Sequence, residues 1–233
     1  MSTNTLNLST SNAAANVQRL RRLDACAVSD ALDKLQLRGT VSGLTQLSSS
    51  RRIAGRVSTV KLVRHAEAEA ARTGPPRHLC TTAIEASGPD HVIVVEQRTG
   101  LDAGSWGGIL TLGAKLRGVA GVIAEGPVRD IDEARQYDFP VFARGLTAIT
   151  ARGRVAEIGT GLDIAVGDIT VQADDYVIAD NSGVIFIRAA DIARVLDAAE
   201  QIVAREAAMA KALLAGEPVS QVMGASYEHM LKT

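Results

Sequence analysis

The chain has 233 residues and a formal net charge of −1, with 46% hydrophobic and 22% charged residues. This near-neutral charge excludes long-range attraction to nucleic acid or to an anionic membrane, so any bound anion must be held by a local site. The sequence has neither a signal-peptide pattern at its start nor an apolar run long enough to span a bilayer, which predicts a cytoplasmic location.

The first part of the chain predicts an arm followed by one domain. Residues 1–15, rich in Ser, Thr, Asn and Ala, are typical of a flexible arm. The absence of an internal repeat or linker favours a single domain over residues 16–233. Apolar residues recur at helical spacing from Val17 to Leu37, which predicts a helix there. The next expected elements are a strand over 53–63, a turn over 73–77 and a helix over 78–86.

The middle of the chain predicts a strand–helix–strand unit. The runs His91–Glu96 and Val119–Ala124 are rich in β-branched residues, which suits buried strands. Between them a helix is predicted over Trp106–Arg117, with Ser105 as its N-cap and Gly118 as its stop. The two strands of such a unit should be parallel and joined by a right-handed crossover.

Alternating strands and helices continue to the end of the chain and predict an α/β fold with helical extensions at both ends. The remaining expected elements are a helix over 130–137, strands over 140–143, 163–171 and 176–188 with a hairpin at 180–183, and helices over 189–214 and 219–230.

Two loops of the central strand–helix–strand unit carry residues that could bind a substrate or a metal ion. The loops that leave parallel strands emerge at one edge of the sheet, where α/β proteins usually bind ligands. The first loop ends in Gly107 and Gly108 at a helix start, and the second ends in Arg129 and Asp130. The sequence therefore predicts an anion-binding helix start beside an Arg–Asp pair.

These residue types suit a 2-oxo acid as substrate. The amides at a helix start favour a carboxylate, and the two glycines leave them open. Arg129 can hold a carboxylate or a developing enolate oxygen through two parallel hydrogen bonds. Asp130 is a hard oxygen ligand suited to Mg²⁺. A structural alternative stays open, because Asp130 and Glu133 have the spacing of a capping box and Arg129 could be an ordinary surface residue.

The glycines also raise a dinucleotide-binding alternative. Gly100, Gly104 and Gly107 follow a GxxxGxxG pattern, whereas the dinucleotide fingerprint is GxGxxG. The preceding loop is too long for the tight turn of that fingerprint. Dinucleotide binding is therefore disfavoured.

One long stretch resembles a known family. The sequence from Asp102 to Gly145, DAGSWGGILTLGAKLRGVAGVIAEGPVRDIDEARQYDFPVFARG, resembles the signature of the RraA-like family. That family includes 4-hydroxy-4-methyl-2-oxoglutarate / 4-carboxy-4-hydroxy-2-oxoadipate aldolases and regulators that bind RNase E. The similarity extends to Val28–Leu32 and to Ile178–Val184. The resemblance implies a β/β/α swivelling domain that assembles as a homotrimer or hexamer with active sites at subunit interfaces.

The resemblance also implies site residues. The family's substrate loop, whose amides hold the pyruvyl carboxylate, falls on Gly107, Gly108, Ile109 and Leu110. Its arginine falls on Arg129 and its metal-binding aspartate on Asp130, with Mg²⁺, Mn²⁺ or another divalent metal as the cofactor. A neighbouring subunit's C-terminal helix can supply an acid, and Glu206 is a weak candidate for it.

One departure from the family concerns proton transfer. Aldolase members often have an acidic residue where this chain has Gly108. A water held by the metal or Asp102 could replace that acid. His78 could also reach the substrate from the start of its helix, but the sequence favours a polar position on the helix rim.

Lysine and histidine placement favours a magnesium-type mechanism. The lysines Lys34, Lys61, Lys115, Lys211 and Lys232 lie away from the expected site, whereas a Schiff-base route needs a desolvated lysine beside the substrate. The four histidines lack the pairwise spacing of a zinc site.

The sequence thus predicts a metal-dependent lyase that cleaves 4-hydroxy-2-oxo acids to pyruvate and a second oxo acid, or decarboxylates oxaloacetate, through an enolate stabilised by metal and arginine. The alternative is a non-catalytic protein similar to the RNase E regulators. The Arg129–Asp130 pair and the loop glycines favour the enzyme, because a pure binding partner does not need them.

Overall fold

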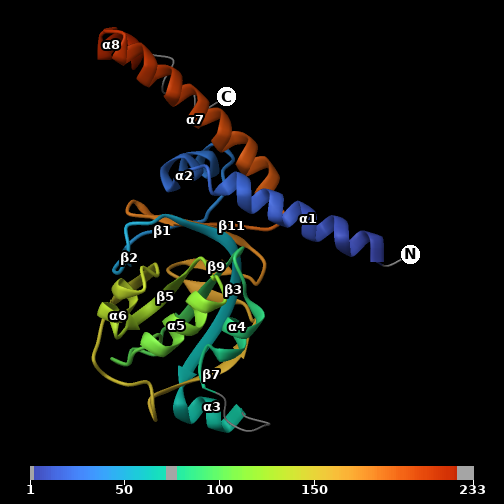
Figure 1. Ribbon diagram of the computed structural model, residues 1–233, viewed down its shortest axis with the longest axis vertical. Coiled ribbons are helices and arrows are strands. Elements are labelled where there is room, and N and C mark those ends of the chain that lie inside the picture. The colour runs from blue at the N-terminus through green and yellow to red at the C-terminus, as the bar shows by residue number, and fades with distance from the viewer. Residues whose placement is uncertain (1–2, 72–77, 225–233) are drawn as a thin grey trace.

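The computed structural model describes residues 3–71 and 78–224 (Figure 1). Its helices are α1 (Thr3–Leu20), α2 (Ala25–Lys34), α3 (His65–Ala71), α4 (Thr81–Ala86), α5 (Gly108–Leu116), α6 (Ile131–Gln136), α7 (Ile192–Leu214) and α8 (Val219–Val222). Its strands are β1 (Thr40–Val41), β2 (Thr45–Gln46), β3 (Ile53–Arg64), β4 (His91–Gln97), β5 (Gly121–Val128), β6 (Val141–Leu146), β7 (Val155–Thr160), β8 (Ile164–Val166), β9 (Ile169–Val171), β10 (Tyr176–Asp180) and β11 (Gly183–Ile187).

One mixed sheet forms the centre of the molecule. Its strand order is β1-β11-β10-β3-β4-β5-β6-β2, with β7 paired to β3. The four strands β3, β4, β5 and β6 are parallel, and the flanking pairs are antiparallel. The unit β4–α5–β5 confirms the predicted strand–helix–strand order with parallel strands. The predicted hairpin is also confirmed, because Asp180 pairs with Gly183 across the β10–β11 turn.

The sheet is covered on both faces, which gives the β/β/α layers that the sequence predicted. Alternate residues of a strand point to opposite faces, and β4 shows this directly. Ile93 and Val95 pack in a core that includes residues of α4, α5 and α6. Val92 and Val94 pack in a second core that includes the separate β8–β9 hairpin.

The N-terminal and C-terminal helices pack on the sheet through a third hydrophobic core. α1, α2 and α7 bury apolar residues against β10 and β11. Arg19 of α1 pairs with Asp197 and Glu200 of α7 at 2.6 and 2.7 Å. Beyond this contact, α1 and the C-terminal half of α7 extend away from the sheet in different directions (Figure 1). No helix in the described parts of the chain has the length and hydropathy needed to cross a bilayer.

Several predicted boundaries differ from the structure. The single helix expected over 17–37 is two helices, because the Asp24 side chain accepts a hydrogen bond from the Ala27 amide at 2.9 Å and starts α2 anew. α1 already begins at Thr3, within the expected arm; the division of the chain at residue 16 stays a prediction. β7 and α3 were not predicted. The expected turn over 73–77 and residues 225–230 of the last expected helix lie outside the described residues.

Candidate functional site

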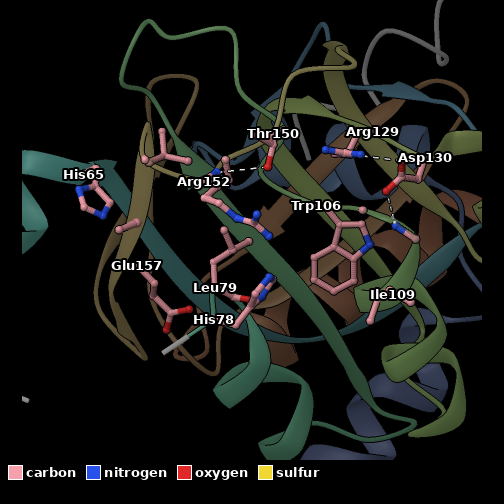
Figure 2. A pocket seen from close by; sticks show the side chains of 17 residues that line it. His65, His78, Leu79, Trp106, Ile109, Arg129, Asp130, Thr150, Arg152 and Glu157 are labelled. Carbon is pink, nitrogen blue, oxygen red and sulfur yellow. Dashed lines mark hydrogen bonds and ion pairs between the residues drawn. The ribbon is translucent and has the colours of Figure 1, made fainter. Parts of the chain in front are cut away.

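A cavity of about 510 Å³ lies where the loops after β4, β5 and β6 meet the residues before α4. Arg129, Asp130 and the start of α5 form one wall (Figure 2). The segment Thr150–Gly153, the pair His78 and Leu79, and residues of α3 and β7 form the rest of its lining. The predicted edge of the sheet is therefore hollow, and the predicted Arg–Asp pair lines it.

Asp130 connects Arg129 to the start of α5. Its Oδ1 lies 3.2 Å from Arg129 Nε, and its Oδ2 accepts a hydrogen bond from the Gly108 amide at 3.0 Å. Asp130 adopts a left-handed backbone conformation (φ 57°, ψ 37°) and makes no side-chain bond to its own helix α6. The capping-box interpretation is therefore wrong: the carboxylate is turned away from α6 and towards the positive end of α5.

Two glycines allow this close contact. A Cβ at Gly107 would lie 2.8 Å from Asp130 Oδ2, and a Cβ at Gly104 would lie 3.0 Å from Arg129 Cγ. Ser105 does not cap α5, since Gly107 occupies the N-cap position. The Ser105 amide and hydroxyl both donate to the Pro127 carbonyl at 2.9 Å, which fastens this loop to the end of β5.

The amides of the predicted substrate loop divide into two groups. The Gly108 amide is already bonded to Asp130, and the Thr111 amide donates to Gly107 O at 3.0 Å. No acceptor is recorded among the described residues for the amides of Gly107, Ile109 and Leu110, as expected at the start of a helix. These three amides of the predicted loop remain to receive a substrate carboxylate.

Glu133 lies beside the site, a position that the sequence interpretation missed. A Cβ built at Gly108 would lie only 1.8 Å from Glu133 Oε2, so this carboxylate occupies the space of a residue-108 side chain. Glu133 does not line the cavity itself, but Gly108 does. A signal for it existed in the sequence: residues three apart lie on the same side of a helix, and Glu133 follows Asp130 by three.

The donor set suits a hydrated Mg²⁺-type cation. Asp130 and Glu133 supply hard oxygens, and each carboxylate oxygen can accept more than one bond. The described residues contain no cluster of three or more His, Cys, Asp or Glu side chains that could hold a metal. Mg²⁺ in proteins is usually bound by one or two carboxylates, and water and substrate complete its coordination shell. A structural zinc site, in contrast, needs four protein ligands.

Only some of the other residues that the sequence suggested for the site line the cavity. His78 lines the cavity, whereas Asp102 and Glu206 do not. Glu206 lies on α7 of the same chain, and burial, followed by the nearby carboxylates of Asp24 and Asp30, raises its pKa. The described lysines are absent from the lining, in agreement with a route that uses no Schiff base. Arg152 and Glu157 line the cavity and were not singled out from the sequence.

Comparison with known proteins agrees with this fold. The sequence profile of the RraA-like family, described as Aldolase/RraA, matches residues 25–186. A protein of Halalkalibacterium halodurans provisionally named 4-hydroxy-4-methyl-2-oxoglutarate aldolase is 26% identical over 197 residues, which are 84% of this chain and 88% of that protein.

Two further similarities concern length and shape. Protein DlpA of Legionella pneumophila is 26% identical over 171 residues, which are 73% of this chain but only 27% of DlpA. The crystal structure of an uncharacterized protein from Pseudomonas syringae has a TM-score of 0.79 at 25% identity, covering 91% of this chain and 98% of that one.

Proposed function

The chain belongs to the RraA-like family and has its mixed α/β fold, and on this premise we propose that it is a divalent-metal-dependent carbon–carbon lyase. Its substrates would be 4-hydroxy-2-oxo acids, cleaved to pyruvate and a second oxo acid, and oxaloacetate, which it would decarboxylate. The observation that carries this proposal is the Asp130 carboxylate, which joins Arg129 to the start of α5 on the wall of one cavity.

Both reactions need the same stabilisation of negative charge. In retro-aldol cleavage the 4-hydroxyl loses its proton, the C3–C4 bond breaks, and its electron pair passes to the 2-oxo group as an enolate. In oxaloacetate the bond to the departing CO₂ breaks and leaves the same enolate. A proton added at C3 then gives pyruvate. A site that stabilises charge on the 2-oxo oxygen therefore serves both substrates.

The residues of this chain can supply that stabilisation. Arg129 uses Nε for Asp130, so its two terminal nitrogens remain to donate to substrate oxygens. The Ile109 and Leu110 amides would hold the substrate carboxylate at the positive end of α5. A divalent cation held by Asp130 and Glu133 would supply additional positive charge for the 2-oxo oxygen.

Retro-aldol cleavage also needs a base for the 4-hydroxyl, and we propose His78. Its ring lies in the cavity (Figure 2), where Nδ1 is 3.2 Å from the Leu79 carbonyl. The Glu157 carboxylate is less suited, because it already accepts from the Cys80 amide at 2.6 Å and from the Thr160 hydroxyl at 2.7 Å. Decarboxylation needs no such base, so loss of His78 should affect the two reactions differently.

A homotrimer or hexamer is proposed as the working assembly. The isolated chain exposes large apolar side chains beside the cavity, with Ile109 83% and Leu146 54% accessible. Large apolar side chains that are left exposed on an isolated chain are candidates for burial at a subunit interface. Light scattering coupled to gel filtration would measure the mass, and a monomer under assay conditions would contradict this part of the proposal.

The experiment that tests the function is pyruvate release from 4-hydroxy-4-methyl-2-oxoglutarate and from oxaloacetate, with Mg²⁺, with Mn²⁺ and with EDTA. Metal-dependent release from either substrate would support the lyase, and the ratio of the two rates would define its preference. Absence of turnover with both, in protein that is folded and supplied with metal, would overturn it. The non-catalytic regulator would then become the better explanation.

A further inference from the structure

The cavity has a second cationic residue, on a different segment from Arg129. Arg152 lies in the turn between β6 and β7, and in Figure 2 its side chain extends into the middle of the cavity towards His78. Arg129 and the start of α5 form a separate wall, and the side chain of Leu79 lies among the lining residues as well. The cavity therefore presents one cationic group at each of two places.

The guanidinium of Arg152 is exposed, and among the described residues no carboxylate forms an ion pair with it. The one acidic lining residue on this side, Glu157, is committed to the Cys80 amide and the Thr160 hydroxyl. Asp130 is committed to Arg129 and Gly108. A guanidinium that faces a cavity and has no ion-pair partner favours an anionic ligand beside it.

The segment that carries Arg152 is held in place by its own hydrogen bonds. The Arg152 amide donates to Thr150 Oγ1 at 3.3 Å, and Arg154 Nη1 donates to the carbonyls of Thr150 and Arg152 at 3.3 and 3.5 Å. The Gly104 amide donates to the Ile149 carbonyl at 2.9 Å, which ties this segment to the loop before α5. The position of Arg152 relative to the first wall is thereby restricted, as a recognition residue requires.

We propose that Arg152 binds a second carboxylate of the substrate, at the end remote from the 2-oxo acid group. The chain would then be selective for 2-oxo dicarboxylates over 2-oxo monocarboxylates of the same length. A guanidinium suits this role because its planar fork matches a carboxylate with two parallel hydrogen bonds. The inference rests on the proposed function for the identity of the first carboxylate, but it can be tested without turnover.

The test is calorimetric binding, with Mg²⁺ present, of 2-oxoglutarate and 2-oxopentanoate. These two acids differ only in a terminal carboxylate or methyl group, and neither has the 4-hydroxyl that retro-aldol cleavage needs. We expect the wild-type protein to bind the diacid at least about tenfold more tightly, the scale of one hydrogen-bonded charge. Arg152→Gln should remove this preference and leave 2-oxopentanoate binding unchanged, and Arg152→Lys should retain part of it.

Arg205→Gln is the charge-matched control, because Arg205 is an exposed arginine on α7 that does not line the cavity. It should keep the preference for the diacid. Equal binding of both acids by the wild type, or a preference that survives in Arg152→Gln, would overturn the inference. A preserved binding preference in a protein that releases no pyruvate would instead refute only the lyase, and pyruvate release without the preference would refute only the role of Arg152.

Discussion

The Glu133 carboxylate lies where a side chain at Gly108 would begin, since a Cβ at Gly108 would be 1.8 Å from Glu133 Oε2. We therefore expect Gly108→Ala to displace Glu133 from the start of α5. Because the displaced group is the far end of a flexible side chain, the protein should still fold. Pyruvate release should fall by about tenfold or more, as expected when a charged group leaves a metal or substrate site.

Gly113→Ala provides the control for that substitution. Gly113 is in the same helix, and its added Cβ would meet only Ile84 Cγ2 at an ordinary 3.7 Å. Replacing a helical glycine by alanine should stabilise the protein by about 0.5–1 kcal/mol, with activity unchanged. Thermal unfolding and steady-state kinetics on both variants would check this, and full activity in Gly108→Ala would show that the position of Glu133 is immaterial.

Asp130 should have two separable roles, one in stability and one in activity. Asp130→Asn keeps an oxygen that can accept from the Gly108 amide, so we expect near-normal stability but little metal-dependent turnover. Asp130→Ala should lose turnover as well and also about 1 kcal/mol of stability, because the Gly108 amide loses its acceptor. Magnesium titration and denaturant unfolding of both variants measure the two effects. Metal-dependent activity retained by Asp130→Asn would refute the metal-ligand role.

The sequence predicted that the Arg129–Asp130 pair would meet the start of α5, because this contact follows from long-range rules of sheet topology that the residue pattern expresses. Two β-branched runs around one helix determine a parallel unit, and the parallel unit determines that the loops after its strands adjoin. The Arg129–Asp130 pair and the glycines at the start of α5 were therefore expected together, and the structure has them in contact.

The finer contacts could not be predicted because they depend on single backbone angles and on side chains far apart in sequence. The left-handed conformation of Asp130 turns its carboxylate from α6 to α5, and no spacing rule distinguishes this from a capping box. Arg152 enters the cavity through a turn stabilised by threonine hydroxyls and carbonyls. The pattern of apolar residues around this turn does not indicate that the turn lies beside the cavity.

Arg129→Lys should lose most of the activity although the positive charge is retained. A lysine cannot both keep the Nε contact to Asp130 and present two further donors in a plane to the substrate. We expect kcat/KM to fall by about 10- to 100-fold, with the fold intact because the side chain is partly exposed. Kinetics with oxaloacetate would measure this, and a loss of less than about twofold would argue against an arginine-bound enolate.

Glu206 provides a pH-dependent prediction for the contact between α2 and α7. Burial raises the pKa of Glu206 above 4.5, and the carboxylates of Asp24 and Asp30 raise it further. Because the folded protein then binds this proton more tightly than the unfolded chain, the contribution of Glu206 to stability is most favourable below pH 4.5. It is lost as the pH rises through the folded-state pKa.

Glu206→Gln should therefore raise the melting temperature by about 1 °C at pH 7 and have no effect at pH 4, where the wild-type carboxyl is largely protonated. Glu217→Gln is the control: both glutamates are exposed, but Glu217 lies beyond the end of α7. Calorimetric melting of the three proteins at both pH values would measure the difference. An equal rise at both values would mean that loss of charge at residue 206 is not the cause, because the repulsion from Asp24 and Asp30 exists only when Glu206 is ionised.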